Sequence, residues 1–406
     1  MSSKFQLNEK LILIYLIIVF SLSITVPQLH FLNDISVKVF IFLTVIIMGF
    51  SFSNITEKKF KQPDLLEFLF LLVTASFLIS SFYVNFDDNF NLFSLMTLLT
   101  YVINFVMFFL ILGKNFRLST YKFDKFINLI LIFAIFLSFA SLIFYSLGIH
   151  YLTQYSHTSA GLFGHPNTTS MFYTICVPVL FYKYFSKKIS FPVFISLLVL
   201  FLIVLLLTLS RAGYIGVGIG ILFYTFYKSR AMFVVVSIIV AIVALTVVAD
   251  FASAKVDSSA SRFLLLLAAY SIITRTDTTM LWGYGPVNGE QVFINEKFFF
   301  GNEPVPNPHN LLMQLSIQFG VLFTLLMSLT IVTLLLKGIF LKFKNEKFKN
   351  DHRLSLCLTV IISLIVQNFF EDVLVNPLYF VMPVFTVFCG FVYYSLKYKD
   401  EIVQVP

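Results

Sequence analysis

Four residues in the second half of the chain, Arg211, Arg262, Arg275 and His309, have side chains suited to one kind of reaction. A guanidinium keeps its charge and binds phosphate oxygens through paired hydrogen bonds. A neutral histidine can take a proton from a hydroxyl group. Together these groups suit a reaction in which pyrophosphate leaves and an alcohol attacks, with arginine binding the phosphate and histidine acting as general base.

Arg211 occupies an unusual position, because it is the only charged residue between Lys188 and Lys228. An apolar run of this length equals about two membrane crossings, since one crossing takes roughly 20 residues. The sequence Ser-Arg-Ala-Gly at 210–213 predicts a turn between two helices, with the guanidinium at the membrane surface. An ionisable group in such a place is expensive and indicates a function. The structural alternative is that Arg211 only extends to the lipid headgroups.

The composition identifies an integral membrane protein. Hydrophobic residues make up 59% of the chain and charged residues 12%, whereas soluble domains carry about 25% charged residues. The pattern predicts an all-α, polytopic protein of about 12 transmembrane helices, with residues 1–406 forming a single transmembrane domain. The predicted spans are 11–29, 36–53, 65–83, 92–112, 126–147, 167–185, 191–209, 212–227, 231–249, 310–336, 354–372 and 377–396.

The distribution of basic residues predicts the orientation. Of the 28 Lys and Arg residues, 22 fall in one alternate set of connecting segments, which includes both termini. Lys and Arg accumulate on the cytoplasmic side, so both termini are expected there. The net charge of +8 is therefore a topology signal, and we expect no nucleic-acid partner. The six basic residues expected outside are Lys38, Arg211, Lys255, Arg262, Arg275 and Lys297.

One predicted external loop, residues 250–308 between the ninth and tenth spans, is much longer than the others. Its apolar piece, residues 263–273, is too short to cross a bilayer and is expected to lie on the surface or dip into it. Long loops in compact proteins are usually functional. The acidic pairs Asp87-Asp88 and Glu371-Asp372 have no Asp-x-Asp spacing, so a metal-independent reaction without a cofactor is favoured.

Three sets of residues carry a resemblance to a known family. They are the turn at 210–213, the sequence Gly-Leu-Phe-Gly-His-Pro-Asn at 161–167, and Trp-Gly-Tyr-Gly-Pro at 282–286 followed by Pro-His-Asn at 308–310. In order, spacing and common face they resemble the O-antigen ligase and polymerase superfamily of bacterial polytopic membrane glycosyltransferases. The resemblance covers roughly residues 155–325.

The resemblance implies roles for the candidate residues. Arg211 would hold the pyrophosphate of a polyprenyl-pyrophosphate-linked glycan, Arg262 would assist it, and His309 would be the general base that activates the acceptor hydroxyl. Direct attack on the anomeric carbon implies inversion. In many members a tryptophan follows the loop arginine, whereas Arg262 is followed by Phe263 and leucines. Arg275 therefore remains a competitor for the second phosphate-binding role.

Three further residues, His165, Tyr284 and Asn310, are candidate substrate contacts with structural alternatives. His165 could instead shape the turn into the sixth span together with Asn167. Asn310 could be a helix N-cap beside His309, and Tyr284 could be an interfacial anchor. Arg262 could anchor a surface helix.

Our first hypothesis is an O-antigen or capsular polysaccharide polymerase of the bacterial cytoplasmic membrane with its active site on the external face. It would transfer a lipid-linked glycan to a sugar hydroxyl of a lipid-linked repeat unit. The alternatives are a ligase that transfers finished glycan to lipid A-core or protein, and a twelve-helix transporter. The expected partners are the lipid-linked donor, the glycan acceptor and the bilayer, with a flippase and a chain-length regulator as candidates.

Overall fold

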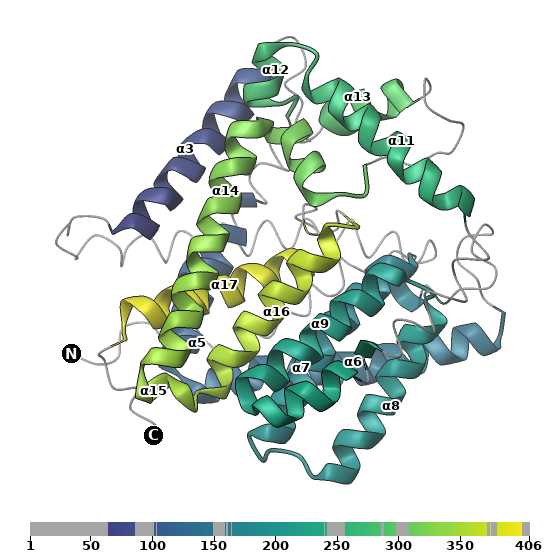
Figure 1. Cartoon of the computed structure of the whole chain (residues 1–406), viewed down its shortest axis with the longest axis vertical. Coiled ribbons are helices and arrows are strands. Elements are labelled where there is room, and N and C mark those ends of the chain that lie inside the picture. The colour runs from purple at the N-terminus through teal and green to yellow at the C-terminus, as the bar shows by residue number, and fades with distance from the viewer. Residues whose placement is uncertain are drawn as a thin grey trace.

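The computed structural model describes residues 64–85, 101–102, 104–148, 159, 161–163, 165–238, 240–241, 256–285, 288–297, 308–371, 374 and 380–399. Within these ranges all regular structure is helical and no strand occurs (Figure 1). This confirms the all-α class. The predicted spans 11–29 and 36–53 and the pair Asp87-Asp88 lie outside the described residues.

Most of the other predicted spans correspond to helices. These are α3 (Leu65–Asn85), α6 (Thr120–Ser146), α7 (Pro166–Phe185), α8 (Phe191–Leu207), α9 (Arg211–Lys228), α14 (Leu311–Lys344), α16 (His352–Asn368) and α17 (Val381–Lys397). Among the described residues, α6 and α14 are long and apolar enough to cross a membrane. The number of spans therefore stays a prediction.

The helix expected to end near residue 112 continues beyond it. The π-helix η2 (Phe105–Leu112) leads directly into α5 (Gly113–Leu118). Gly113 lies against Gly390 of α17, where a side chain on either residue would meet backbone atoms. The chain stays helical through Lys114 and Arg117, which the charge pattern had placed between spans.

Part of the predicted external loop is helical, with α11 (Val256–Ile273), α12 (Asp277–Trp282) and α13 (Asn288–Lys297). The buried residues of this region form a small core of their own. Its members are Ala268, Ala269, Ile272 and Ile273 of α11, Phe293 of α13 and Ile317 of α14. Phe263 and Tyr270 on α11 are exposed. The apolar piece therefore uses one face to pack the loop onto the first third of α14.

A kink in α14 is the point where this loop attaches. Gly320 has non-helical backbone angles (φ 84°, ψ 164°), so the helical hydrogen bonds across it are broken. The carbonyls of Ile317 and Gln318 instead accept from the backbone N–H groups of Tyr284 and Gly285, both at 2.8 Å. A side chain on Gly320 would overlap the carbonyl of Leu281, so this crossing requires glycine.

Three helices, α7, α9 and α16, pack closely through small side chains. Gly216 of α9 faces Thr174 of α7 and Gln367 of α16, and a methyl group there would approach their side-chain oxygens to 2.9 and 2.8 Å. The Gln367 amide accepts from Thr174 Oγ1 (2.6 Å) and donates to Ser170 Oγ (3.1 Å). A buried amide satisfied at both ends fixes the two helices relative to one another.

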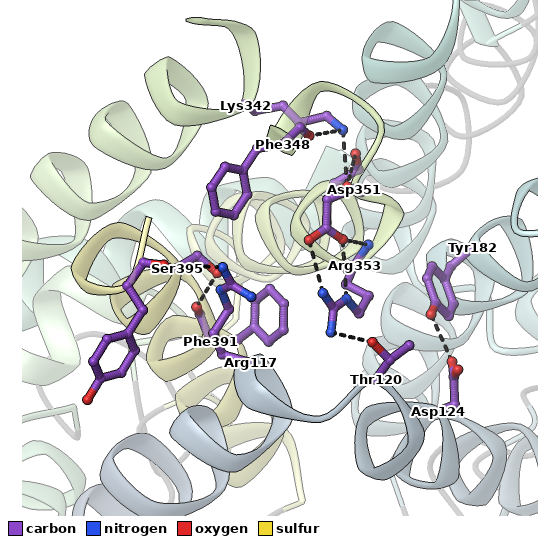
Figure 2. Close-up of polar contacts among 12 residues, drawn as sticks. Arg117, Thr120, Asp124, Tyr182, Lys342, Phe348, Asp351, Arg353, Phe391 and Ser395 are labelled. Atoms are coloured by element: carbon purple, nitrogen blue, oxygen red, sulfur yellow. Dashed lines mark hydrogen bonds and ion pairs between the residues drawn. The ribbon is translucent and has the colours of Figure 1, made fainter. Parts of the chain in front are cut away.

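A second polar cluster lies at the start of α16 and connects it to α6 and to the turn after α14 (Figure 2). The buried Lys342 of α14 donates to the carbonyls of Phe348, Lys349 and Asp351 at 3.0, 2.7 and 3.0 Å. It thereby closes the turn that contains the short helix α15 (Glu346–Lys349). Arg353 of α16 pairs with Asp351 and donates to Thr120 Oγ1 of α6 at 3.0 Å.

Candidate functional site

Three helices, α7, α9 and α14, begin at the same end of the molecule. Their N-caps are His165, Ser210 and Asn310, and each side chain accepts from a backbone N–H in the first turn of its own helix. The hydroxyls of Ser170 and Ser210 lie 2.9 Å apart and join the start of α7 to the start of α9. Helix N-termini carry partial positive charge, so a group of them favours an anion.

Arg211 is the first residue of α9 and is partly buried. A positive charge at a helix N-terminus is unfavourable for the helix itself, because it opposes the helix dipole. Local helix stability therefore gives no reason for an arginine at this position. The guanidinium and the N-terminal N–H groups of α9 have the same sign, and together they suit a bound anion such as pyrophosphate.

His309 lies directly before α14 and its backbone is left-handed (φ 48°). Its side chain is 21% exposed, and Nδ1 lies 3.2 Å from Oε2 of Glu371. The neighbouring Asn310 accepts from the N–H groups of Leu312 and Met313 and donates to the carbonyl of Phe369 at 2.9 Å. The start of α14 is thus tied to the end of α16, and the imidazole is held with part of its surface exposed.

His165 and Asn167 complete this end of the molecule. Nδ1 of His165 accepts from the backbone N–H of Asn167 at 3.2 Å, which caps α7 as the turn-forming alternative expected. Burial lowers the pKa of His165, while the nearby Glu371 raises it and His309 lowers it further. Desolvation outweighs the attraction to Glu371, so the neutral ring is favoured at His165. Its role as a substrate contact stays a prediction.

Glu371 is the residue of this region to which the sequence pattern had assigned no role. α16 ends at Asn368, so Glu371 lies beyond the helix rather than inside the predicted span. It is buried, and Oε1 accepts from Nδ2 of Asn167 at 2.6 Å while Oε2 faces His309. The one signal in the sequence was a carboxylate at the end of an apolar segment, which is uncommon.

The remaining candidates lie in the predicted external loop or at the start of α14. Arg262 belongs to α11 and Arg275 is exposed just beyond its end, so about 17 Å of helix, from Arg262 to Ile273, lies between them. Tyr284 packs against the small core, and its hydroxyl lies 3.4 Å from the carbonyl of Ile272. The amide of Asn310 makes hydrogen bonds within the protein at both ends. Direct contact of these residues with substrate stays a prediction.

The open groove of about 560 Å³ at the C-terminal end of α14 is lined by residues that include Lys337, Lys344 and Lys399, and it contacts none of the candidate residues. Among the described residues, no group of three or more His, Cys, Asp or Glu side chains is arranged to hold a metal ion. The joint role of Arg211 and His309 stays a prediction.

The comparison with known families agrees with the motifs. No curated protein matches the chain. Residues 196–328 match the family described as O-antigen ligase. The matched segment contains Arg211, Arg262, Arg275, Tyr284, His309 and Asn310. The segment begins after His165 and ends before Glu371, so both lie outside it. Residues 196–328 are thus similar to the O-antigen ligase family, which agrees with the resemblance of the sequence motifs to the O-antigen ligase and polymerase superfamily of glycosyltransferase-like membrane enzymes.

Proposed function

We propose that this protein is a polysaccharide polymerase of the bacterial cytoplasmic membrane. It transfers a glycan from a polyprenyl pyrophosphate carrier to a sugar hydroxyl of the next lipid-linked repeat unit, on the external face. The observation that supports the proposal is that Arg211 and His309 lie at the starts of α9 and α14. Hydrogen bonds of neighbouring residues join these starts to α7 and to the end of α16. The family domain favours an enzyme over a transporter.

The reaction needs one base and one anion site. The acceptor hydroxyl gives its proton to Nε2 of His309 while its oxygen bonds to the anomeric carbon of the donor. The bond between that carbon and the phosphate oxygen breaks, and its electron pair leaves on the pyrophosphate, which Arg211 binds. Attack from the face opposite the leaving group inverts the anomeric centre. The protonated histidine then returns its proton to water.

A second cation from the external loop would share the charge of the leaving pyrophosphate. Arg262 and Arg275 are separate candidates, because Arg262 lies inside α11 and Arg275 lies two residues beyond its end. Replacing each by glutamine separately assigns the role. The glutamine variant of the arginine that binds pyrophosphate is expected to have a lower kcat, measured with donor and acceptor both at saturation. The reason is that the charge of the leaving group develops in the transition state.

A ligase is the alternative, and the description of the matching family as O-antigen ligase favours it. The two functions leave different surface glycans in a strain that lacks the gene. Loss of a polymerase leaves single repeat units on the surface lipid, whereas loss of a ligase leaves finished polymer on the polyprenyl carrier. Analysis of both pools in one deletion strain decides between them. A flippase or chain-length regulator can be sought by crosslinking in a strain that contains the protein.

The chemistry is tested with His309→Ala and Arg211→Ala at matched protein levels. Loss of a general base lowers the rate by about 10²–10⁴-fold, so both variants are expected to lack long glycan chains. Arg230→Ala and His352→Ala are the controls, since Arg230 follows the other end of α9 and His352 begins α16 at the far end. Normal chain lengths from both test variants would remove the proposed mechanism.

A further inference from the structure

The carboxylate of Glu371 has both oxygens engaged by groups from two other parts of the chain. Oε1 accepts from Asn167 Nδ2 at 2.6 Å, near the start of α7. Oε2 lies 3.2 Å from His309 Nδ1, directly before α14. The Glu371 side chain is 2% exposed and that of His309 is 21% exposed. A carboxylate so deeply buried is unfavourable unless it is hydrogen-bonded, and here the partner that reaches the surface is the proposed base.

These contacts determine which nitrogen of His309 carries the proton. The Asn167 amide can only donate to Oε1, so that oxygen acts as an acceptor. An ionised Glu371 also accepts at Oε2, which places a hydrogen on Nδ1 of His309. The neutral ring then has its lone pair on Nε2. A carboxylate that selects the tautomer also stabilises the imidazolium formed after proton transfer.

Neighbouring contacts also fix the position of the His309 imidazole. The left-handed backbone of His309 is followed at once by Asn310, whose side chain binds the first turn of α14 and the carbonyl of Phe369. Phe369 and Glu371 belong to the same segment after α16. The backbone and the ring of His309 are therefore fixed to one segment through two independent contacts.

We propose that Asn167 and Glu371 form a positioning pair, in which Asn167 orients the Glu371 carboxylate and the carboxylate holds His309 with Nε2 as the proton acceptor. The inference rests on the proposed function, because it concerns the base of that reaction. It assigns a role to two residues that lie outside the matched family segment. The simpler reading is that the same contacts only join α7 to α16.

Glu371→Gln separates these two roles. Glutamine has nearly the same size and can still accept from Asn167, but its amide N–H would donate to Nδ1 of His309 and leave the hydrogen on Nε2. The positioning role predicts a fall in kcat of about 10²–10⁴-fold, with KM and thermal stability close to those of the unmodified protein. A purely joining role predicts a kcat within a few-fold of normal.

The assay uses purified full-length protein and lipid-linked repeat units extracted from the deletion strain. Glu67→Gln is the matched control, because Glu67 is a partly buried carboxylate that pairs with Lys397 and Tyr393 at the start of α3. Its kcat is expected to stay normal. Asn167→Ala should lower kcat by about 10–100-fold, as loss of a supporting partner does. If Glu371→Gln does not fold, the kcat of Asn167→Ala is the measurement that tests the proposal.

A double variant distinguishes failure of this inference from failure of the proposed function. If Glu371 acts through His309, adding Glu371→Gln to His309→Ala causes no further loss of kcat. A full further loss in the double variant, or normal kcat in Glu371→Gln and Asn167→Ala while His309→Ala is inactive, overturns the positioning pair and leaves the proposed base in place. Normal kcat in His309→Ala overturns the proposed base itself.

Discussion

His309 has a left-handed backbone conformation that is unfavourable for histidine. A left-handed backbone costs about 1 kcal/mol or more for a residue other than glycine, and glycine or asparagine would adopt it more easily. The structure nevertheless places histidine there, with φ 48° and Nδ1 against Glu371. Such a conformation persists only where neighbouring contacts impose it, which agrees with the hydrogen bonds of Asn310 to α14 and α16.

His165 supports a prediction about acid sensitivity. Burial lowers its pKa below the ordinary 6.5, so the unfolded chain binds more protons than the folded one as the pH falls through that value. Acidification therefore destabilises the fold, by up to about 1.4 kcal/mol per pH unit for one group. In His165→Asn the cap is retained by a residue that does not titrate, and the acid-dependent loss of stability should be smaller.

Thermal unfolding of the purified protein at about pH 7.5 and about pH 5.5 measures this difference. The unmodified protein should lose more of its melting temperature on acidification than His165→Asn does. At the higher pH the two proteins should unfold at similar temperatures, because both have a capped α7. Equal losses in both proteins would mean that His165 takes no part in the acid response.

At the scale of elements, the kink of α14 links helices α11 and α12 of the predicted external loop to the helix that follows His309. Gly320 interrupts the regular hydrogen bonding of α14. The N–H groups of Tyr284 and Gly285 donate to two carbonyls of α14 just before it. Gly283, with φ 73°, contributes a second close approach, because a side chain there would come within 2.6 Å of Gln318 and Gly320. The Trp-Gly-Tyr-Gly motif therefore acts in this structure as the attachment of the loop to α14.

Gly320→Ala is expected to destabilise the protein by at least about 2 kcal/mol, because it adds backbone strain at positive φ and an overlap with Leu281. Gly218→Ala is the matched control. Gly218 lies inside α9, and its side chain would meet only Val240 at an ordinary 3.5 Å. Since alanine is the better helix former, that variant should be as stable as the unmodified protein or slightly more so. Equal melting temperatures for the two variants would contradict the role of the kink.

At the scale of the whole molecule, the two ends of the helix group have different chemistry. One end holds the three helix starts, Arg211 and the His309–Glu371 pair. The other holds the buried Lys342, which donates to backbone carbonyls, and the partly buried Arg353, which pairs with Asp351 (Figure 2). α9 runs from one end to the other over 18 residues, about 27 Å. Which end faces outward stays a prediction from the distribution of basic residues.

Cysteine labelling tests that orientation. The three native cysteines are buried, so background labelling should be low. Asp277→Cys at the start of α12 and Arg230→Cys after α9 introduce exposed thiols. A membrane-impermeant maleimide should label position 277 from the external side, and position 230 only after the membrane is opened. Labelling of both from the same side would overturn the proposed external site.

The amino-acid sequence by itself determined the helical class, the approximate positions of most described helices and the candidate residues Arg211 and His309. These features depend on apolar periodicity, charge distribution and short motifs, which are local in the chain. Only the tertiary structure decided that Glu371 joins His309, 62 residues away, to Asn167, 204 residues away, and that the kink at Gly320 receives the external loop. Contacts between distant segments leave no periodic pattern in a sequence, because they are set by how the helices pack.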